Sequence, residues 1–181
     1  MRIRVPLALV VFTVVLLGGI VAGCSDDAAV RSVLQVTEIN GNQPLSSDVA
    51  EGPDSSITIR EDAIVITVSN TPHDAVLNLA SGKPFSVITL ESYEIRFEGD
   101  ESIPPVSGAL GWTVESGKTV EGSLVVVPAS LKVQAPLISL RRGGEIQTTA
   151  WLTITGREAT SGSKVKVEAS FPVNFANWAD Q

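Results

Sequence analysis

The single cysteine, Cys24, is the side chain best suited to covalent chemistry in this chain of 181 residues. A thiolate is a soft nucleophile, so a thiol can accept a lipid group that a hydroxyl would not. Cys24 stands in GGIVAGCSDDAAV, between an apolar run and two aspartates. An exported chain with one unpaired thiol would be unusual. The placement therefore predicts that this thiol is modified.

The residues before Cys24 have the pattern of a secretory signal. A positively charged MRIR precedes the apolar PLALVVFTVVLLGGIVAG, which ends in small side chains. Val21-Ala22-Gly23-Cys24 resembles the lipobox of bacterial lipoproteins. The resemblance implies that diacylglycerol alkylates the thiol and that a peptidase, admitted by the small Ala22 and Gly23, cuts before Cys24. Acyl chains on Cys24 would then hold the protein at a membrane.

This resemblance sets the expected organisation of the chain. We expect a signal peptide at 1–23, a lipidated linker at 24–30 and one folded domain at 31–181. Each buried methylene contributes about 0.8 kcal/mol, so two or three acyl chains anchor essentially permanently. Lipoproteins kept at the inner membrane carry aspartate where this chain has Ser25. The resemblance thus implies that the protein is anchored in the outer membrane, on either its periplasmic or its surface face. An uncleaved transmembrane anchor over 5–23 is the first alternative, and a soluble secreted protein the second.

The chain offers little for nucleophilic or metal catalysis. His73, the only histidine, lies in the turn-like NTPHDA, and there is no G-x-S-x-G motif. We expect a solvated loop histidine and not the base of a serine triad. One histidine and one lipidated cysteine also fall short of a zinc site. We therefore expect no metal, no cofactor and no enzyme activity.

A group of acids in mid-chain is the remaining acid–base candidate. Two carboxylates about 5–10 Å apart in a cleft could hydrolyse an envelope polysaccharide, although we expect a solvated strand face and loop. EGDES also offers a weak cation site at Glu98, Asp100 and Glu101, because calcium prefers oxygen ligands. It lacks the D-x-D-x-D-G spacing. The five acids are Glu91, Glu94, Glu98, Asp100 and Glu101.

Trp151 is the best candidate for recognition. It shares the polar face of its expected strand with threonines, among them Thr149 and Thr153. An exposed tryptophan there would suit a glycan, small-ligand or protein partner. The competing interpretation, which we favour, is that a loop such as residues 128–144 covers Trp151.

Two other groups lead to weaker expectations. Trp178, in FANWAD, is expected to plug one end of the domain. Arg141-Arg142 precedes two glycines and could clamp an anionic partner. A turn with solvated arginines is the favoured interpretation of that pair.

The elements that must position these side chains are strands, because the dominant hydrophobic period is two. KVKVEASFPVNF and EIQTTAWLTITG each alternate apolar and polar residues, and the polar REATSGSK between them predicts a C-terminal hairpin. Pro172 marks an edge or a bulge. The apolar parity changes near Glu91-Ser92, which predicts a β-bulge or a strand that crosses between sheets. Only residues 128–144 could hold a helical turn.

Earlier strands are expected at seven places. They are Val33–Ile39, Ile57–Arg60, Ala63–Val68, Ala75–Leu79, Ser86–Phe97, Leu110–Val114 and Val120–Val127. Short strands at this spacing predict an all-β fold, first an immunoglobulin-like, disulfide-free β-sandwich of the fibronectin kind and second a closed barrel.

The charge of the domain excludes some partners. From Cys24 onward the chain keeps 11 of its 13 basic residues against 20 acidic ones, a formal charge of −9. Such a domain is a poor nucleic-acid binder. Anionic head groups would repel it, so membrane association must come from the anchor.

The body of the chain resembles uncharacterised exported bacterial lipoproteins with one immunoglobulin-like domain. The resemblance rests on the lipobox and on INGNQPLSSDV, FSVITLESYEIRF and VEASFPVNFANWAD. It implies surface display and no known activity. We expect a lipid-anchored, non-enzymatic envelope protein that presents an acidic β-sandwich to a protein or glycan.

Overall fold

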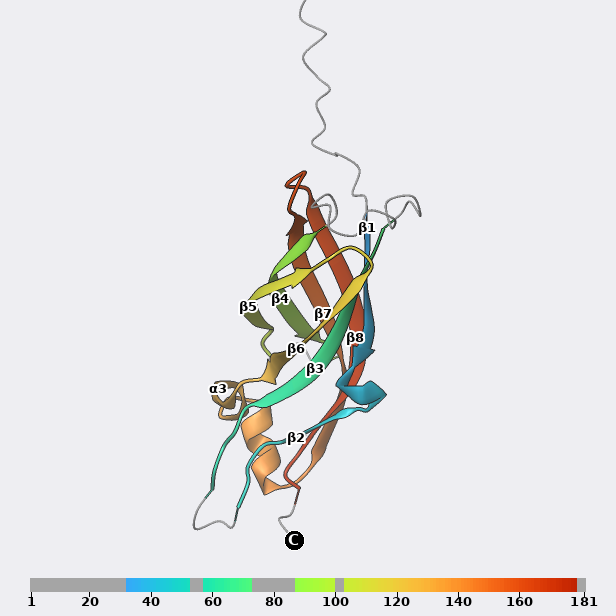
Figure 1. The fold of residues 1–181 in the computed structure, drawn as a ribbon. Coiled ribbons are helices and arrows are strands. Elements are labelled where there is room, and N and C mark those ends of the chain that lie inside the picture. Colours follow the sequence, from blue (N-terminus) through green and yellow to red (C-terminus); the bar gives the residue numbers. More distant parts are fainter. Residues whose placement is uncertain (1–31, 53–56, 73–86, 100–102, 179–181) are drawn as a thin grey trace, which may run out of the picture.

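The computed structural model describes residues 32–52, 57–72, 87–99 and 103–178. Their strands form two sheets (Figure 1). The three-stranded sheet has the order β1-β3-β6, from Ser32–Ile39, Asp62–Pro72 and Lys118–Val127. The five-stranded sheet has the order β2-β8-β7-β4-β5, from Leu45–Asp48, Lys164–Ala176, Glu145–Glu158, Ile88–Phe97 and Val106–Val114. The prediction of an all-β fold is confirmed.

Several expectations fall outside the described residues. These are the signal peptide, the lipobox with Cys24, the linker, His73, the strand over Ala75–Leu79, Asp100 and Glu101. Among the residues that are described, no helix is long and apolar enough to cross a membrane.

The C-terminal hairpin is confirmed over its whole length. β7 and β8 pair antiparallel from Glu145↔Ala176 to Arg157↔Lys164. Alternate side chains face the interior, where Leu152 and Phe175 are buried. β8 also pairs with β2, but this pairing begins at Val173, one residue after Pro172. Proline has no N–H to donate, and none is needed on the β2 side at this position. The register with β7 has no shift at Pro172, so there is no bulge; β8 itself lies between β2 and β7, and Pro172 stands at a local edge where the pairing with β2 has not yet begun.

The predicted bulge in mid-chain is also confirmed. β4 pairs with both β5 and β7, and both registers shift between Leu90 and Ser92. The extra residue lets Leu90 and Tyr93 both face the interior, although their positions differ in parity. The Tyr93 hydroxyl donates to Val125 O at 3.0 Å, and burial raises the pKa of this phenol. Tyr93 thereby links the two sheets.

Other boundaries differ from the sequence prediction. Residues 57–60 form no strand, and only Thr58 makes an isolated bridge, to Glu51. β2, which pairs parallel to β8 from Leu45↔Val173, is not predicted. It follows a tight turn, η1 (Asn40–Asn42), in which three consecutive residues have positive φ. This turn carries the chain from the edge of one sheet to the edge of the other.

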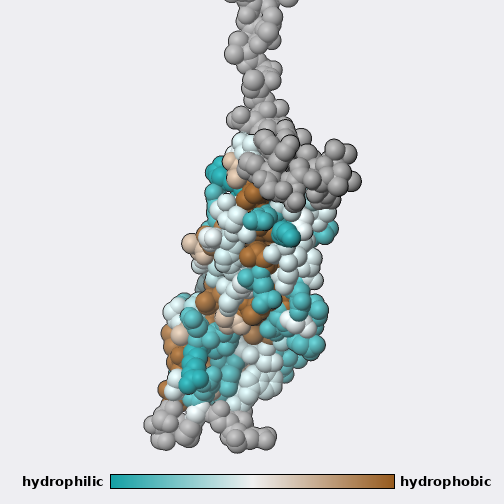
Figure 2. All heavy atoms as spheres, viewed as in Figure 1, coloured by the Kyte–Doolittle hydropathy of each residue, from teal (hydrophilic) through white to brown (hydrophobic). Residues whose placement is uncertain are grey.

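The segment over 128–144 holds the only helices described after β6. They are α3 (Ala129–Lys132) and the 3-10 helix η3 (Leu137–Arg142), which confirms the predicted helical turn. Leu131, Leu137 and Leu140 bury their side chains in the common core. The view over the three-stranded sheet shows small hydrophobic spots between hydrophilic residues (Figure 2).

Candidate functional site

The outer face of the five-stranded sheet carries the most side chains able to bind a ligand. The pairing registers arrange them in rows that cross the strands from β5 to β8. The first row is Ala109, Ser92, Thr155 and Lys166, the second is Ser107, Glu94, Thr153 and Glu168, and the third is Arg96, Trp151 and Ser170. Residues in one row are neighbours on the same face, because paired side chains point the same way.

Trp151 is the large apolar side chain of this face. It is 49% exposed, so the expectation that a loop covers it is wrong and the alternative, an exposed tryptophan, is confirmed. The segment expected to cover it packs elsewhere, with Lys132 against β2 and β3. Trp151 Nε1 donates to Glu98 Oε2 at 2.9 Å, which fixes the edge of the indole and leaves much of the ring accessible.

The charged side chains of the face are paired with one another. Arg96 Nε lies 2.7 Å from Glu94 Oε1, and Lys166 Nζ lies 2.5 Å from Glu168 Oε1. The hydrogen bond from Lys166 lowers the pKa of the Glu168 carboxyl, to which Thr153 also hydrogen-bonds. In the other pair, the hydrogen bond to Glu94 raises the pKa of the Arg96 guanidinium. The four groups add no net charge.

Two shallow hollows adjoin on this face. One, of about 310 Å³, is lined by Trp151 with Glu94, Arg96, Leu152, Thr153, Lys166 and Glu168. The other, of about 480 Å³, is lined by Ser92, Tyr93, Glu94, Ser107, Gly108, Ala109, Thr153 and Thr155. Both linings include Glu94 and Thr153, so the two hollows are adjacent, and together we call them the trough. Thr149 lies one row beyond Trp151 and does not line it.

The acids considered for hydrolysis each contact a different neighbour. Glu91 lies 3.2 Å from Arg157 Nε, Glu94 binds Arg96, and Glu98 accepts from Trp151. The weak cation site keeps only Glu98 inside the described residues. Within those residues no three metal-ligating side chains gather.

Two expectations near the C-terminus need correction. Trp178 is 42% exposed and does not plug the sandwich. Gly143 and Gly144 have positive φ, which confirms the turn. Arg141 Nε and Nη2, however, are buried without a hydrogen-bond partner, so this guanidinium is not the solvated one expected. η3 contacts β8. A local sequence pattern does not reveal a tertiary contact of this kind, so the burial of Arg141 was not predicted.

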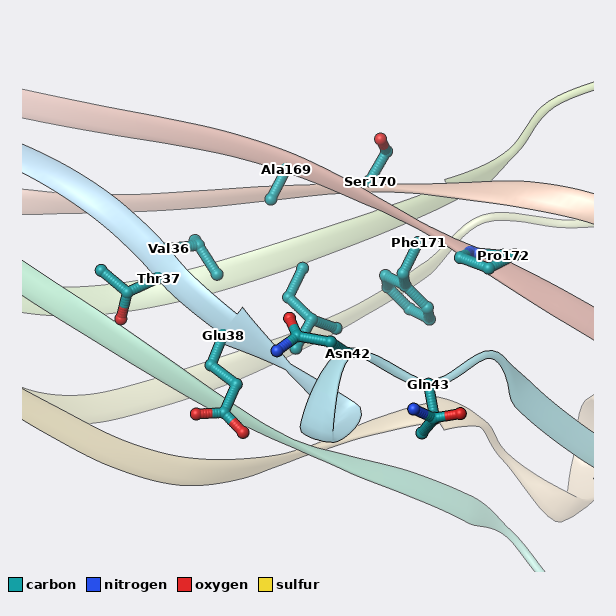
Figure 3. A pocket seen from close by; sticks show the side chains of 10 residues that line it. Val36, Thr37, Glu38, Asn42, Gln43, Ala169, Ser170, Phe171 and Pro172 are labelled. Carbon is teal, nitrogen blue, oxygen red and sulfur yellow. The ribbon is translucent and has the colours of Figure 1, made fainter.

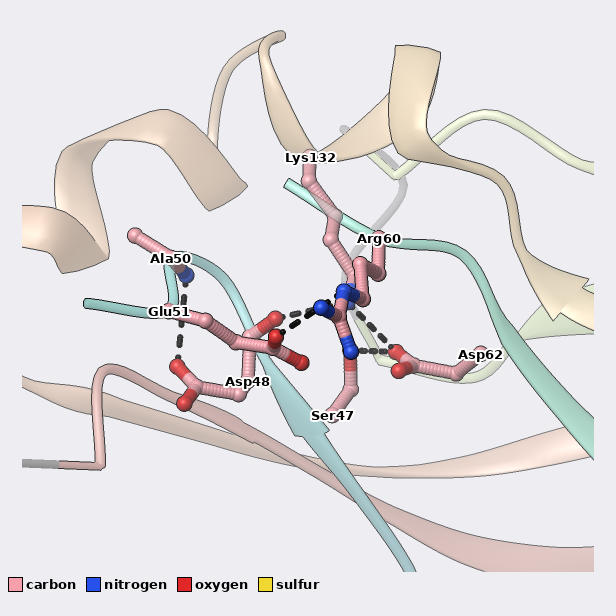
Figure 4. Close-up of polar contacts among 7 residues, drawn as sticks. All are labelled: Ser47, Asp48, Ala50, Glu51, Arg60, Asp62 and Lys132. Atoms are coloured by element: carbon pink, nitrogen blue, oxygen red, sulfur yellow. Dashed lines mark hydrogen bonds and ion pairs between the residues drawn. The ribbon is translucent and has the colours of Figure 1, made fainter. Parts of the chain in front are cut away.

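A buried polar cluster was missed by the sequence analysis (Figure 4). Lys132 is 1% exposed, and its Nζ lies 2.9 Å from Asp62 Oδ2 and donates to Asp48 O at 2.6 Å. Ser47 Oγ, also buried, donates to the same Asp62 oxygen at 2.5 Å. A substrate cannot reach such a serine, so the cluster fastens α3 to β2 and β3. In the sequence, the only sign of this cluster is a lysine at the end of the short segment ASLK, next to Leu131.

A third hollow lies between β1 and β8 (Figure 3). It measures about 330 Å³ and opens where the chain leaves β1 for β2, between Ile39 and Phe171. Glu38 is the one charged side chain among the residues that line it.

Comparison with protein-family models and with curated proteins finds no match to this chain.

Proposed function

We propose that the protein is a lipid-anchored, non-enzymatic component of the cell envelope that binds a glycan or a protein through the outer face of its five-stranded sheet. One observation carries the proposal. Trp151 stands half exposed, with its edge held by Glu98, among side chains that can donate and accept hydrogen bonds. Binding sites combine such an apolar platform with a few placed polar groups.

The strand order supports an immunoglobulin-like sandwich. In that arrangement the first, second and fifth strands share one sheet, and the third, sixth and seventh share the other. If β1 and β2 count as two halves of the first strand, then β1-β3-β6 and β4-β7-β8 match it. β5 pairs with β4 instead of β6, unlike the constant-type immunoglobulin arrangement.

The lipobox motif supports the anchor and, with Ser25, a place at the outer membrane. Metabolic labelling with a radioactive fatty acid tests it. We expect label and membrane fractionation to disappear in Cys24→Ser. If Cys24→Ser keeps both, the lipoprotein assignment is wrong.

Binding without catalysis is supported by the state of the acids. Glu91, Glu94 and Glu98 each have a partner on the face, and none of them shares a partner with another. Hydrolysis of a glycoside requires two carboxylates that act on one bond. Glu94 and Glu168 line one hollow, where each is engaged by a neighbouring cation, Arg96 and Lys166 respectively.

Site-specific photocrosslinking in native membranes tests the choice of face. The full-length protein would carry the photoreactive residue at Thr153, which lines the trough. Val65 is the matched control, because it is 48% exposed on β3 of the other sheet. We expect adducts from position 153 and not from position 65. Equal adducts at both positions would contradict the proposal.

A further inference from the structure

Resting on the proposed function, we infer that the trough binds an extended, uncharged oligosaccharide that lies across the strands from β8 to β5. The ligand class, the course of the ligand across the strands and the length of ligand that the trough holds are specified beyond the proposed function.

In the hollow over β5, β4 and β7 the floor of the trough consists mainly of short side chains, whereas Lys166 and Glu168 stand at its β8 end. Ser107 and Ala109 point outward from β5, Ser92 from β4, and Thr153 and Thr155 from β7. Ser92 Oγ and Thr155 Oγ1 lie 2.8 Å apart, so the hydroxyls already form a small hydrogen-bonding network. A floor that is low and rich in hydroxyl groups suits a ligand that is itself rich in hydroxyl groups.

Taller side chains stand at the side of the trough where Trp151 and Arg96 are paired neighbours. The lining of one hollow comes from β5, β4 and β7, and that of the other from β4, β7 and β8, so the trough reaches across four strands. From β5 to β8 it crosses three spacings of about 4.8 Å each, or about 14 Å.

The charges of the trough favour a neutral ligand. Glu94 is paired with Arg96, and Glu168 with Lys166, so no unpaired charge lines it. An anionic or cationic ligand would have to break one of these pairs. A sugar can instead hydrogen-bond to their outward lone pairs and N–H groups while an indole ring packs on its apolar face.

A second copy of this chain fits the face less well. The cores of protein interfaces are apolar and depleted of charge. Trp151 is the one large exposed hydrophobic side chain that the described residues place on this face. Four charged side chains surround it within a single hollow.

Titrations of the full-length protein in detergent test the inference. The probes are cello-, malto- and chito-oligosaccharides of increasing length, with an oligogalacturonate as the acidic counterpart. We expect affinity for one neutral series to rise with length and then level off. It should change little with salt, since no net charge is neutralised. Binding of the acidic probe alone, or affinity that does not depend on length, would overturn the inference.

Variants at the far end of the trough locate the ligand. Ala109→Arg fills the floor on β5, far from Trp151, and should weaken a long oligosaccharide about tenfold while sparing a short one. Ser107→Gln is the milder second variant. Thr113→Arg, outward on the same strand but outside the trough, is the control. Equal losses for long and short probes would overturn the inferred extent. Adducts at position 153 without binding of any neutral oligosaccharide would leave the proposed face standing and overturn the inferred ligand.

Discussion

Two lysine–carboxylate pairs of this protein differ in what surrounds them. Lys166 and Glu168 approach to 2.5 Å on the outer face, with 59% and 57% of their side chains exposed. Lys132 and Asp62 lie 2.9 Å apart, with 1% and 20% exposed. Exposed pairs contribute at most about 1 kcal/mol, whereas removing one partner of a buried pair costs about 3–5 kcal/mol.

The Lys166–Glu168 contact is the shorter of the two, yet it contributes less to the stability of the fold than the Lys132–Asp62 contact. The buried cluster around Lys132 stabilises the fold, whereas the side chains of the outer face around Lys166 are free to form hydrogen bonds with a ligand. In the buried cluster at α3, Lys132 Nζ and Ser47 Oγ both face Asp62, and Lys132 also binds Asp48 O. The outer face keeps its ion pairs in water, where a ligand can hydrogen-bond to them without unfolding anything. Substitutions in the two pairs test this difference.

Removal of the buried ammonium should have the largest effect on stability. Lys132→Ala removes the cation that pairs with Asp62 and the donor to Asp48 O, leaving Asp62 with only the Ser47 hydroxyl, and we expect a loss of about 3–5 kcal/mol in the free energy of unfolding. Urea denaturation followed by circular dichroism measures it. Lys166→Ala is the control and should lose much less, because its ion pair with Glu168 is exposed to water. Similar losses for the two lysine variants would show that burial does not separate the pairs.

The hydroxyl of the buried cluster should contribute less. Ser47→Ala removes the hydrogen bond to Asp62 Oδ2 but leaves Lys132 paired. We expect a loss of about 1–2 kcal/mol. The control is Ser170→Ala on the outer face, which should stay within about 0.5 kcal/mol of the wild type. If the Ser47→Ala protein is as stable as the wild type, the hydrogen bond from Ser47 to Asp62 does not contribute to the stability of the cluster.

The smallest effect concerns pH and the outer face. Lys166 lowers the pKa of Glu168 in the folded state. The pair therefore stabilises the protein above the ordinary glutamate pKa of about 4.3, and this is lost as pH falls through the depressed folded value. Proton-detected titration of the Glu168 side chain by NMR should show a low pKa that returns toward about 4.3 in Lys166→Ala. An unchanged pKa would mean that the pair is absent in solution.

Much of the fold could be predicted because alternation is a local signal. The period of two in KVKVEASFPVNF and EIQTTAWLTITG placed β7, β8 and the outward direction of Trp151. The parity change placed the bulge in β4. β2 was missed because its four residues, LSSD, carry almost no pattern and pair in parallel with a strand more than a hundred positions away.

The site was predictable only in part, for a related reason. Thr153 and Trp151 could be assigned to one face of one strand. Their neighbours Arg96, Glu94 and Glu168 come from two other strands, and only the registers bring them together. The burial of Lys132 was not predictable at all, since a lysine is ordinarily exposed and its partners arrive from β2 and β3.

The central claim, that Trp151 forms a binding face, has one direct test. Isothermal titration of the full-length protein with the tightest-binding neutral oligosaccharide would compare the wild type, Trp151→Ala and Trp178→Ala. Trp178 is nearly as exposed but lies beyond the end of β8. We predict at least a tenfold loss of affinity for Trp151→Ala, about 1.4 kcal/mol or more, and none for Trp178→Ala. Unchanged affinity in Trp151→Ala, or an equal loss in Trp178→Ala, would contradict the account.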